Sequence, residues 1–304
     1  MKIAITTSSF GKFSDQPLDL LKAKGLDLVL NPHGRALKPE ETIVLLAGCA
    51  GVVAGTEKYT QSILETLPEL KVISRCGAGL DSIDLSAAKK LGILVKNTPE
   101  APTQAVAELV LGMAFDLVRG ISRQDRDIRA GKWQKRMGGL VSALQVGIIG
   151  MGRIGRAVEA KFSALGATCA YSDPYVPFLE GRPCPRMELD ELLGWADLVS
   201  IHVPGNPDGG PLLDAAKIGL LKPGAWLLNC ARGGVLDEAA LYKRLKEESL
   251  SGAGLDVFEN EPYSGPLTTL ENVLLTPHIG SYAVQSRIEM ELEASWNLLV
   301  TLGI

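Results

Sequence analysis

Three glycines in the spacing G-x-G-x-x-G follow a short apolar run, and no other feature of the sequence constrains the fold as tightly. The run Gln145–Ile149 has the composition of a buried strand, and the residues after Gly155 have a helical pattern. In such a strand–turn–helix unit, Gly150 makes the tight turn, Gly152 lets the backbone approach a pyrophosphate, and Gly155 lets helix and strand pack closely. The amides at the start of the helix would face the phosphates. The motif therefore predicts a dinucleotide-binding site.

An acidic residue stands at the distance from these glycines that such a site requires. The next expected strand, 168–172, ends at Asp173, 18 residues after Gly155. A carboxylate there accepts hydrogen bonds from the adenosine ribose hydroxyls and repels a 2′-phosphate. Taken alone, Asp173 before Pro174 would be a turn residue at a strand end. Together with the glycines, it predicts NAD rather than NADP.

Short apolar runs alternate with helical patterns along the whole chain, which is typical of parallel sheets covered by helices on both faces. At 304 residues the chain exceeds the size at which a single hydrophobic core usually stops growing. We therefore expect two doubly wound α/β domains, joined by helices near 103–118 and 282–299. The expected strands are 2–6, 27–30, 52–54, 71–74 and 93–95 in the first domain, and 145–149, 168–172, 198–203, 225–229, 252–256 and 273–275 in the second.

Composition argues against several other classes of protein. A net charge of −4 gives no field that would gather nucleic acid or an anionic membrane. The five cysteines form no C-x-x-C pair, which favours free thiols in a reducing compartment and leaves a structural metal without its usual ligands. Met1–Phe10 lacks the pattern of a signal peptide, and the apolar run Ile43–Gly55 is too short to span a bilayer. We expect a soluble cytoplasmic protein that binds a small molecule and no metal.

The segment Arg119–Lys135 is basic but contains Asp125 and Asp127, and its charges of both signs recur at three- and four-residue spacing. Mixed signs at this spacing fit a solvated helix better than a nucleic-acid site. We expect this segment to lie at the surface or in a subunit contact.

Histidine is scarce, and imidazole is the side chain that titrates near neutral pH, at roughly 6.5. His278 stands where an expected strand ends, which is the edge at which open α/β sheets bind ligands. It is the candidate acid–base, although its motif alone fits a loop histidine equally well. His202 ends another strand, where it either satisfies itself against backbone or meets the cofactor. His33 lies in an Asn-Pro-His-Gly turn and is expected at the surface.

Two charged residues complete the candidate constellation. Arg232 follows the strand 225–229 and is flanked by glycines, so its guanidinium can hold a carboxylate through two parallel hydrogen bonds. The alternative is a surface arginine before a helix capped by Asp237. Glu261 is placed to orient His278 and stabilise its protonated form, whereas taken singly it would be a loop acid.

These motifs together resemble the D-isomer-specific 2-hydroxyacid dehydrogenases, and within them the short members similar to phosphoglycerate dehydrogenase. The resemblance implies that Arg232 binds the substrate carboxylate and carbonyl, that His278 is the acid–base and that Glu261 pairs with it. The segments that carry it are Arg75–Asp84, Asn97–Pro99, Ala105–Leu109, the glycine motif with Asp173, His202–Pro204, Asn229–Gly234, Asp256–Pro262 and Thr276–Gly280.

The resemblance also implies further contacts. The amides of Ala78 and Gly79 would bind the substrate carboxylate, and a glycine-rich turn of consecutive amides is a plausible anion nest. Arg75 would contact substrate, and Asp256 would meet the nicotinamide amide. The other implied cofactor contacts are Thr103, Arg153, Ile154, His202, Val203, Pro204, Cys230 and Ala231.

By the family pattern, both chain ends build the substrate domain. Residues 1–99 plus 279–304 would form this flavodoxin-like domain, residues 100–278 a Rossmann NAD-binding domain, and the cleft between them the active site. Dimerisation through the cofactor domain, including Arg119–Lys135, is also implied. The chain departs from the pattern at Gly205–Gly210, where a larger apolar residue and Thr-Pro are usual, so the resemblance implies no geometry for that loop.

The implied activity is hydride transfer between NAD and a small D-2-hydroxy acid or 2-oxo acid. 3-Phosphoglycerate is one candidate, with Arg75 and Lys58 as phosphate ligands, but Val53–Glu57 lacks an arginine that some phosphoglycerate dehydrogenases have there. Glyoxylate and hydroxypyruvate remain alternatives, as does a nonenzymatic NAD-sensing corepressor on the same scaffold. Formate dehydrogenases carry glutamine beside the histidine, and Glu261 argues against them.

Overall fold

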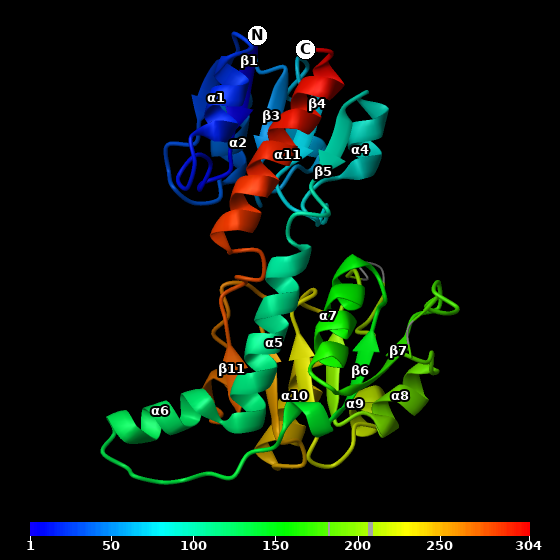
Figure 1. Ribbon diagram of the computed structural model, residues 1–304. Coiled ribbons are helices and arrows are strands. Elements are labelled where there is room, and N and C mark those ends of the chain that lie inside the picture. Colours follow the sequence, from blue (N-terminus) through cyan, green and yellow to red (C-terminus); the bar gives the residue numbers. More distant parts are fainter. Residues whose placement is uncertain (182, 206–208) are drawn as a thin grey trace. The chain divides into compact units, whose positions relative to one another are not determined.

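The computed structural model describes residues 1–181, 183–205 and 209–304 (Figure 1). Residues 206–208 of the loop that departs from the family pattern lie outside this description. The chain divides into two compact units. Unit 1 comprises Met1–Thr103 and Ser281–Ile304, and unit 2 comprises Gln104–Gly280.

Unit 1 is built on a five-stranded sheet in the order β2-β1-β3-β4-β5, in which every pair of neighbours is parallel. This is the flavodoxin-like order, and its direction reverses between β1 and β3. The five strands expected in this part of the chain are confirmed. Their bounds are β1 (Lys2–Ile5), β2 (Asp27–Leu30), β3 (Gly51–Ala54), β4 (Val72–Arg75) and β5 (Leu94–Asn97).

Helices cover both faces of this sheet because its central strands are apolar on both sides. Helices α2, α3 and α4 pack on one face, and α1 and α11 on the other. In Figure 1, α11, the last helix of the chain, runs beside β4 and β5 of the first hundred residues. The bounds are α1 (Gln16–Lys22), α2 (Pro39–Leu46), α3 (Gln61–Leu64), α4 (Leu85–Lys90) and α11 (Val284–Leu302).

Unit 2 is built on a six-stranded parallel sheet in the order β11-β10-β9-β8-β6-β7. A parallel bridge between Tyr171 and Arg186 adds one more backbone pairing outside β7. If the segment at Arg186 is counted as the outermost strand, the strand order is that of the dinucleotide-binding α/β fold. The strand order changes direction between β6 and β8. All six expected strands are confirmed as β6 (Gln145–Ile149), β7 (Thr168–Ser172), β8 (Leu198–Ile201), β9 (Trp226–Asn229), β10 (Gly252–Leu255) and β11 (Val273–Leu275).

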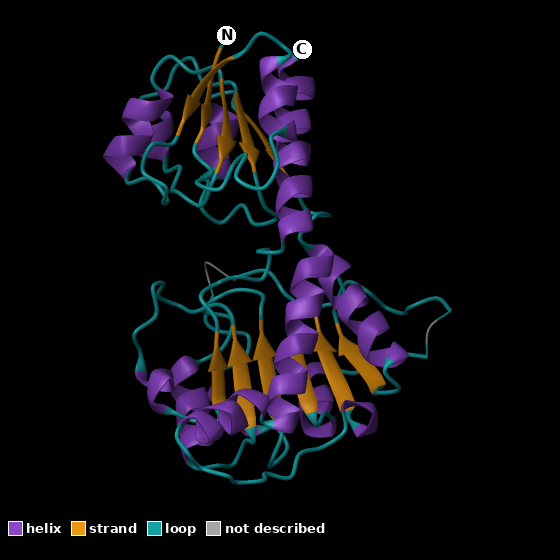
Figure 2. Cartoon of the chain, turned by 60° about the vertical axis from the view of Figure 1, so that its left-hand side comes forward, coloured by secondary structure: helices purple, strands orange, loops and turns teal. Residues whose placement is uncertain are grey.

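The sheet of unit 2 is also sandwiched between helices, as Figure 2 shows. Helices α5 and α7 contribute buried side chains to one face, and α8 and α10 to the other together with α9. Asp237 caps α10 as expected, because its carboxylate accepts the amide of Ala240 at 2.9 Å. The bounds are α5 (Thr103–Arg119), α7 (Arg153–Ala164), α8 (Leu189–Trp195), α9 (Ala215–Gly219), α10 (Glu238–Lys246) and the short 3₁₀ turns η1 (Val141–Ala143) and η2 (Pro266–Thr269).

The basic segment forms a helix only in part. Helix α6 (Ile121–Arg129) has no buried residue, and its ion pair between Arg129 and Asp125 at 2.7 Å follows the expected four-residue spacing. The residues from Gly131 to Leu140 continue without helix or strand. None of the described helices combines the length and apolar character that a membrane span requires.

Candidate active site

The candidate residues of unit 2 follow the carboxyl ends of its strands. Because all six strands are parallel, these ends lie at one edge of the sheet. Leu255 at the end of β10 pairs with Asn229 of β9 on one side and with Leu275 of β11 on the other. The loops that carry Arg232 and His278 therefore leave the sheet on either side of the loop that carries Glu261.

The glycine turn after β6 has the geometry that a bound pyrophosphate needs. Gly150 adopts φ +91°, and a side chain there would collide with the His202 carbonyl. A side chain at Gly155 would collide with the carbonyl of Gly150. Gly152, at the start of α7, faces open space that a Cβ would begin to fill. This cradle beside a helix N-terminus fits the phosphates of a dinucleotide.

Asp173 is tied to the same turn. Its carboxylate accepts the amide of Met151 at 2.7 Å and the amide of Tyr175 at 2.8 Å. Each carboxylate oxygen has room for a second hydrogen bond. The side chain is thus held next to the glycine turn, with acceptor capacity left for ribose hydroxyls.

His202 is held as a neutral imidazole. Its Nε2 lies 2.8 Å from Oγ of Ser200, and its Nδ1 is buried without a hydrogen-bond partner among the described residues. Burial lowers the pKa of His202 to about 3 because the charged form loses its hydration. A group that stays neutral across the physiological range is unsuited to proton transfer, which leaves His278 as the candidate acid–base among the residues that follow these strands.

The Arg232 loop is fixed from both sides. The side chain of Asn229 donates to the carbonyl of Arg232 at 2.9 Å and accepts the amide of Ala231 at 3.0 Å. Gly233 lies so close to the backbone of Phe258 that a Cβ would overlap it. The Arg232 loop therefore packs directly against the loop that leads to Glu261.

His278 and Glu261 form a direct pair. Nδ1 of His278 lies 2.9 Å from Oε2 of Glu261, whose other oxygen accepts the amide of Phe258 at 3.1 Å. The His278 side chain keeps 52% of its surface exposed, so a substrate can reach the ring. A carboxylate in this position fixes the ring orientation and stabilises the imidazolium that an acid–base cycle forms.

Asp256 holds the His278 loop in place. The buried carboxylate accepts the hydroxyl of Thr276 at 2.6 Å and the amides of Ile279 and Gly280 at 2.8 Å each. The backbone carbonyl of Asp256 accepts the amide of His278 at 2.9 Å. His278 has φ +53°, a left-handed conformation that costs about 1–2 kcal/mol for a residue with a side chain. These contacts offset that cost.

The sequence does not predict this clamp, because the resemblance assigns Asp256 to the nicotinamide amide instead. The available signal is an aspartate at the end of an otherwise apolar strand, since a buried carboxylate needs several donors. The spacing to Thr276 does not reveal which donors these are. Only the pairing of β10 with β11 brings the two loops together.

The remaining predicted cofactor residues follow the carboxyl ends of the unit 2 strands, apart from Thr103. Arg153 is exposed and Ile154 half-buried in the first turn of α7, while Cys230 and Ala231 are buried after β9. Burial raises the pKa of the Cys230 thiol, which disfavours its thiolate form. Val203 and Pro204 follow β8, and Thr103, which falls in unit 1, donates its hydroxyl to the carbonyl of Pro99 at 3.4 Å.

Unit 1 holds the predicted substrate residues at the carboxyl end of β4. Arg75 is the last residue of that strand, and the side chain of Asn97 donates to the carbonyl of Ala78 at 2.7 Å. Within the described chain, the amides of Ala78 and Gly79 donate to no backbone or side-chain acceptor. Two adjacent unused amides in a half-exposed turn are donors that an anion can accept from.

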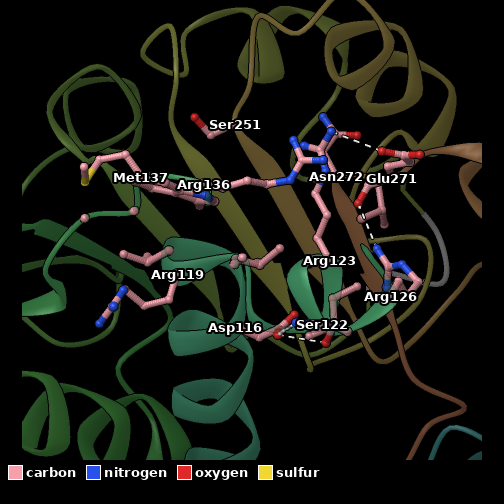
Figure 3. Close-up of a pocket in the computed structure, with 18 residues that line it drawn as sticks. Asp116, Arg119, Ser122, Arg123, Arg126, Arg136, Met137, Ser251, Glu271 and Asn272 are labelled. Atoms are coloured by element: carbon pink, nitrogen blue, oxygen red, sulfur yellow. Dashed lines mark hydrogen bonds and ion pairs between the residues drawn. The ribbon is translucent and has the colours of Figure 1, made fainter. Parts of the chain in front are cut away.

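A separate hollow of about 300 Å³ lies at the opposite edge of the unit 2 sheet (Figure 3). It is lined by the end of α5, by α6 and by the residues that begin β9 and β11. Arg123 and Glu271 form an ion pair there at 3.1 Å. Because this hollow is at the amino ends of the strands, it is distinct from the candidate site.

Comparisons with known proteins agree with this geometry. Residues 111–280 match the family model described as "D-isomer specific 2-hydroxyacid dehydrogenase, NAD binding domain". The chain is 40% identical to the D-3-phosphoglycerate dehydrogenase of Methanocaldococcus jannaschii over 237 residues, which are 76% of this chain and 45% of that protein. The chain thus spans under half the length of this curated relative.

Two further comparisons cover more of both chains. The hydroxypyruvate reductase of Thermotoga maritima is 36% identical over 259 residues, 83% of this chain and 84% of that protein. The crystal structure of the TT0316 protein from Thermus thermophilus superposes with a TM-score of 0.92 at 34% identity, and the match covers 100% of this chain and 97% of that one.

Proposed function

Because the chain belongs to the D-isomer-specific 2-hydroxyacid dehydrogenase family, we propose that it transfers a hydride between NAD and a small D-2-hydroxy acid or its 2-oxo acid. The observation that carries the proposal is the pair of His278 and Glu261, 2.9 Å apart, on loops that pack beside the Arg232 loop. These are the three groups that the reaction needs: a proton donor, a carboxylate that supports it and a cation that holds the substrate.

The mechanism assigns each residue one task. Arg232 holds the substrate carboxylate and carbonyl through its guanidinium. Protonated His278 donates to the oxygen of the carbonyl as it becomes an alkoxide, and Glu261 holds the imidazolium in position. NADH, which Gly150, Gly152 and Asp173 would hold at the glycine turn, would supply the hydride when bound. In the oxidative direction the neutral imidazole takes the hydroxyl proton.

The test is an assay of NADH oxidation over a panel of small 2-oxo acids. Saturable oxidation with at least one of them is expected, and it disappears when Arg232 is replaced by Ala. Tight NADH binding without turnover of any 2-oxo acid would refute the proposal and favour a nonenzymatic NAD sensor.

NAD is the proposed cofactor in preference to NADP because the Asp173 carboxylate stands beside the glycine turn. A 2′-phosphate next to it would meet a like charge. Replacing Asp173 with Ser removes the charge, and the ratio of kcat/KM for NADH to that for NADPH should fall by about 10-fold or more. An unchanged ratio would show that another residue selects the cofactor.

Unit 1 is proposed as the substrate domain and unit 2 as the NAD-binding domain. Arg75 and the amides of Ala78 and Gly79 are the proposed substrate ligands in unit 1, since these amides are unused within the described chain. Replacing Arg75 with Ala should raise KM for the 2-oxo acid while the affinity for NADH stays the same. A change in NADH affinity alone would contradict this division of labour.

The protein is further proposed to be a cytoplasmic homodimer that associates through unit 2. Helix α6 buries none of its residues, and beyond it Trp133 is 83% and Met137 100% exposed. Such a group of apolar side chains is typical of a subunit contact. Sedimentation should give a dimer that Trp133→Asp dissociates, whereas a monomeric wild-type protein would contradict the proposal.

A further inference from the structure

Unit 1 contains a cluster of buried polar side chains whose hydrogen-bonding capacity is not fully used within the described chain. Glu57 is 3% exposed and Thr7 is 5% exposed, yet Oε2 of Glu57 and the hydroxyl of Thr7 have no hydrogen-bond partner among the described residues. Nε of Arg75 is likewise buried and unpartnered. These are three of the five such side-chain atoms in the described part of the chain. Because unpaired buried polar atoms are costly, native proteins rarely group them without a ligand or water.

The three residues lie at the carboxyl ends of neighbouring strands. Thr7 follows β1, Glu57 follows β3 and Arg75 ends β4, and these strands are neighbours. A Cβ at Gly55 would lie 2.7 Å from Oε2 of Glu57 and 3.4 Å from Cα of Thr7, so the carboxylate oxygen sits over Gly55 next to Thr7. The order of the sheet reverses between β1 and β3, and open α/β sheets bind ligands at that point.

The other oxygen of Glu57 is fully engaged, which fixes the carboxylate. Oε1 accepts the hydroxyl of Tyr59 at 2.6 Å, the amide of Gly55 at 3.0 Å and the hydroxyl of Thr6. Three donors on one oxygen fix the orientation of the carboxyl group. These contacts therefore also fix the position of Oε2, which can accept a hydrogen bond from a ligand.

Arg75 forms the partly exposed side of this cluster. Burial lowers the pKa of Arg75, and the charge of Glu57 acts on it in the opposite direction, so the two side chains are electrostatically coupled. A phosphate bound beside Arg75 would also face the negative charge of the buried Glu57 carboxylate, which opposes its binding.

We propose that Glu57 is a specificity-determining residue, whose Oε2 accepts a hydrogen bond from a hydroxyl group of the substrate and disfavours a phosphate at the same position. Nε of Arg75 and the Thr7 hydroxyl complete the contact, because a substrate hydroxyl can donate to Glu57 while it accepts from either of them. The inference rests on the proposed function and narrows its substrates to 2-oxo acids that carry a hydroxyl beyond the carbonyl carbon.

The test compares kcat/KM with NADH for hydroxypyruvate, its 3-phosphate ester and glyoxylate, which lacks the distal group. The wild-type protein should prefer hydroxypyruvate to the phosphate ester by at least about 10-fold. Glu57→Gln should lower that preference by about 10-fold and change kcat/KM for glyoxylate less than about 3-fold. Glu69→Gln, an equal change of charge at an exposed position of the same unit, should leave all three values unchanged.

Thr7→Val provides a second probe, since it removes a hydroxyl that bonds to nothing in the described chain. It should lower kcat/KM for hydroxypyruvate but not for glyoxylate. If Glu57→Gln does not fold, the wild-type ratio and Thr7→Val decide the matter. A wild-type preference for the phosphate ester would overturn the assignment of Glu57. So would variants that turn over glyoxylate and keep the wild-type ratio of kcat/KM for hydroxypyruvate to that for its phosphate ester. Absence of turnover with all three acids would overturn the proposed function and this inference with it.

Discussion

Nδ1 of His278 lies 2.9 Å from Oε2 of Glu261, and the two residues come from loops that follow neighbouring strands of one sheet. The contact orients an imidazole whose backbone is left-handed at φ +53°. A residue with a side chain is rarely held in this conformation unless its surroundings enforce it. The surrounding structure therefore holds the pair in place at the carboxyl ends of the strands, where the cofactor and substrate are proposed to react.

Replacing His278 with Ala should lower kcat by about 10²–10⁴-fold, because proton transfer to the alkoxide loses its donor. The affinity for NADH, measured by fluorescence titration, should stay the same, since the glycine turn and Asp173 are untouched. Turnover equal to that of the wild type would remove His278 from the mechanism.

Replacing Glu261 with Gln should lower kcat by at least about 10-fold, because the imidazolium loses the carboxylate that stabilises it. The amide oxygen can still accept from Phe258, so the loop should keep its shape. Glu259→Gln, the same change at an exposed neighbour, serves as the control and should have no effect on kcat. Equal losses of kcat in both variants would show that the net charge of the loop matters rather than the contact between Glu261 and His278.

Alanine at Gly152 and at Gly155 should have opposite consequences. At Gly152 the added methyl enters open space, so Tm should hold while Kd for NADH rises by about 10-fold or more. At Gly155 the methyl collides with the carbonyl of Gly150, so Tm should fall by several degrees even without cofactor. Calorimetry and NADH titration of both variants check this. A drop in Tm for Gly152→Ala would show that its space is not reserved for a ligand.

His202 should make the stability of unit 2 depend on pH. Its pKa is lowered from 6.5 to about 3 in the folded chain, so below pH 6.5 the unfolded state binds a proton that the folded state does not. Its contribution is complete above pH 6.5 and decreases by about 1.4 kcal/mol per pH unit as the pH falls towards 3.

His202→Gln keeps a side chain that can bond Ser200 but does not titrate. The decrease in Tm between pH 7.5 and pH 5.0 should be smaller in this variant by about 4–8 °C. Identical decreases in the wild type and the variant would show that His202 is protonated in the folded protein.

Replacing Asp256 with Asn should destabilise unit 2, because the amide nitrogen of Asn cannot accept a hydrogen bond. While the amide oxygen keeps Thr276 and Ile279, the amide of Gly280 loses its acceptor and faces another donor. The loss is on the order of 1–3 kcal/mol, seen as a lower Tm without cofactor, together with lower kcat as the His278 loop loosens. Thr276→Val removes one of the three donors and should cost less. If Asp256→Asn altered only NADH affinity, a clamp on this loop would be the wrong description.

The period of the apolar pattern can be read directly from the sequence. This is why the strands of both sheets are predicted, with bounds that are exact or differ by one or two residues. Burial on both faces forces continuous apolar runs such as Ile148 and its neighbours, so the pattern is local. The glycine turn and Asp173 are predicted for a similar reason, since their spacing along the chain determines their geometry. The clamp of Asp256 and the unpartnered oxygen of Glu57 are not, because their partners are distant in sequence or missing from the described chain.

The sequence by itself determined the α/β class, the strand series, the dinucleotide motif and the identity of the residues proposed to carry the chemistry. Tertiary structure alone decided that the ring of His202 is desolvated and that the carboxylate of Asp256 holds the His278 loop. The physical reason is that propensity and periodicity are properties of neighbours along the chain. Hydrogen-bond partners and desolvation depend instead on strand order, which brings Asp256 to Thr276 and buries Nδ1 of His202.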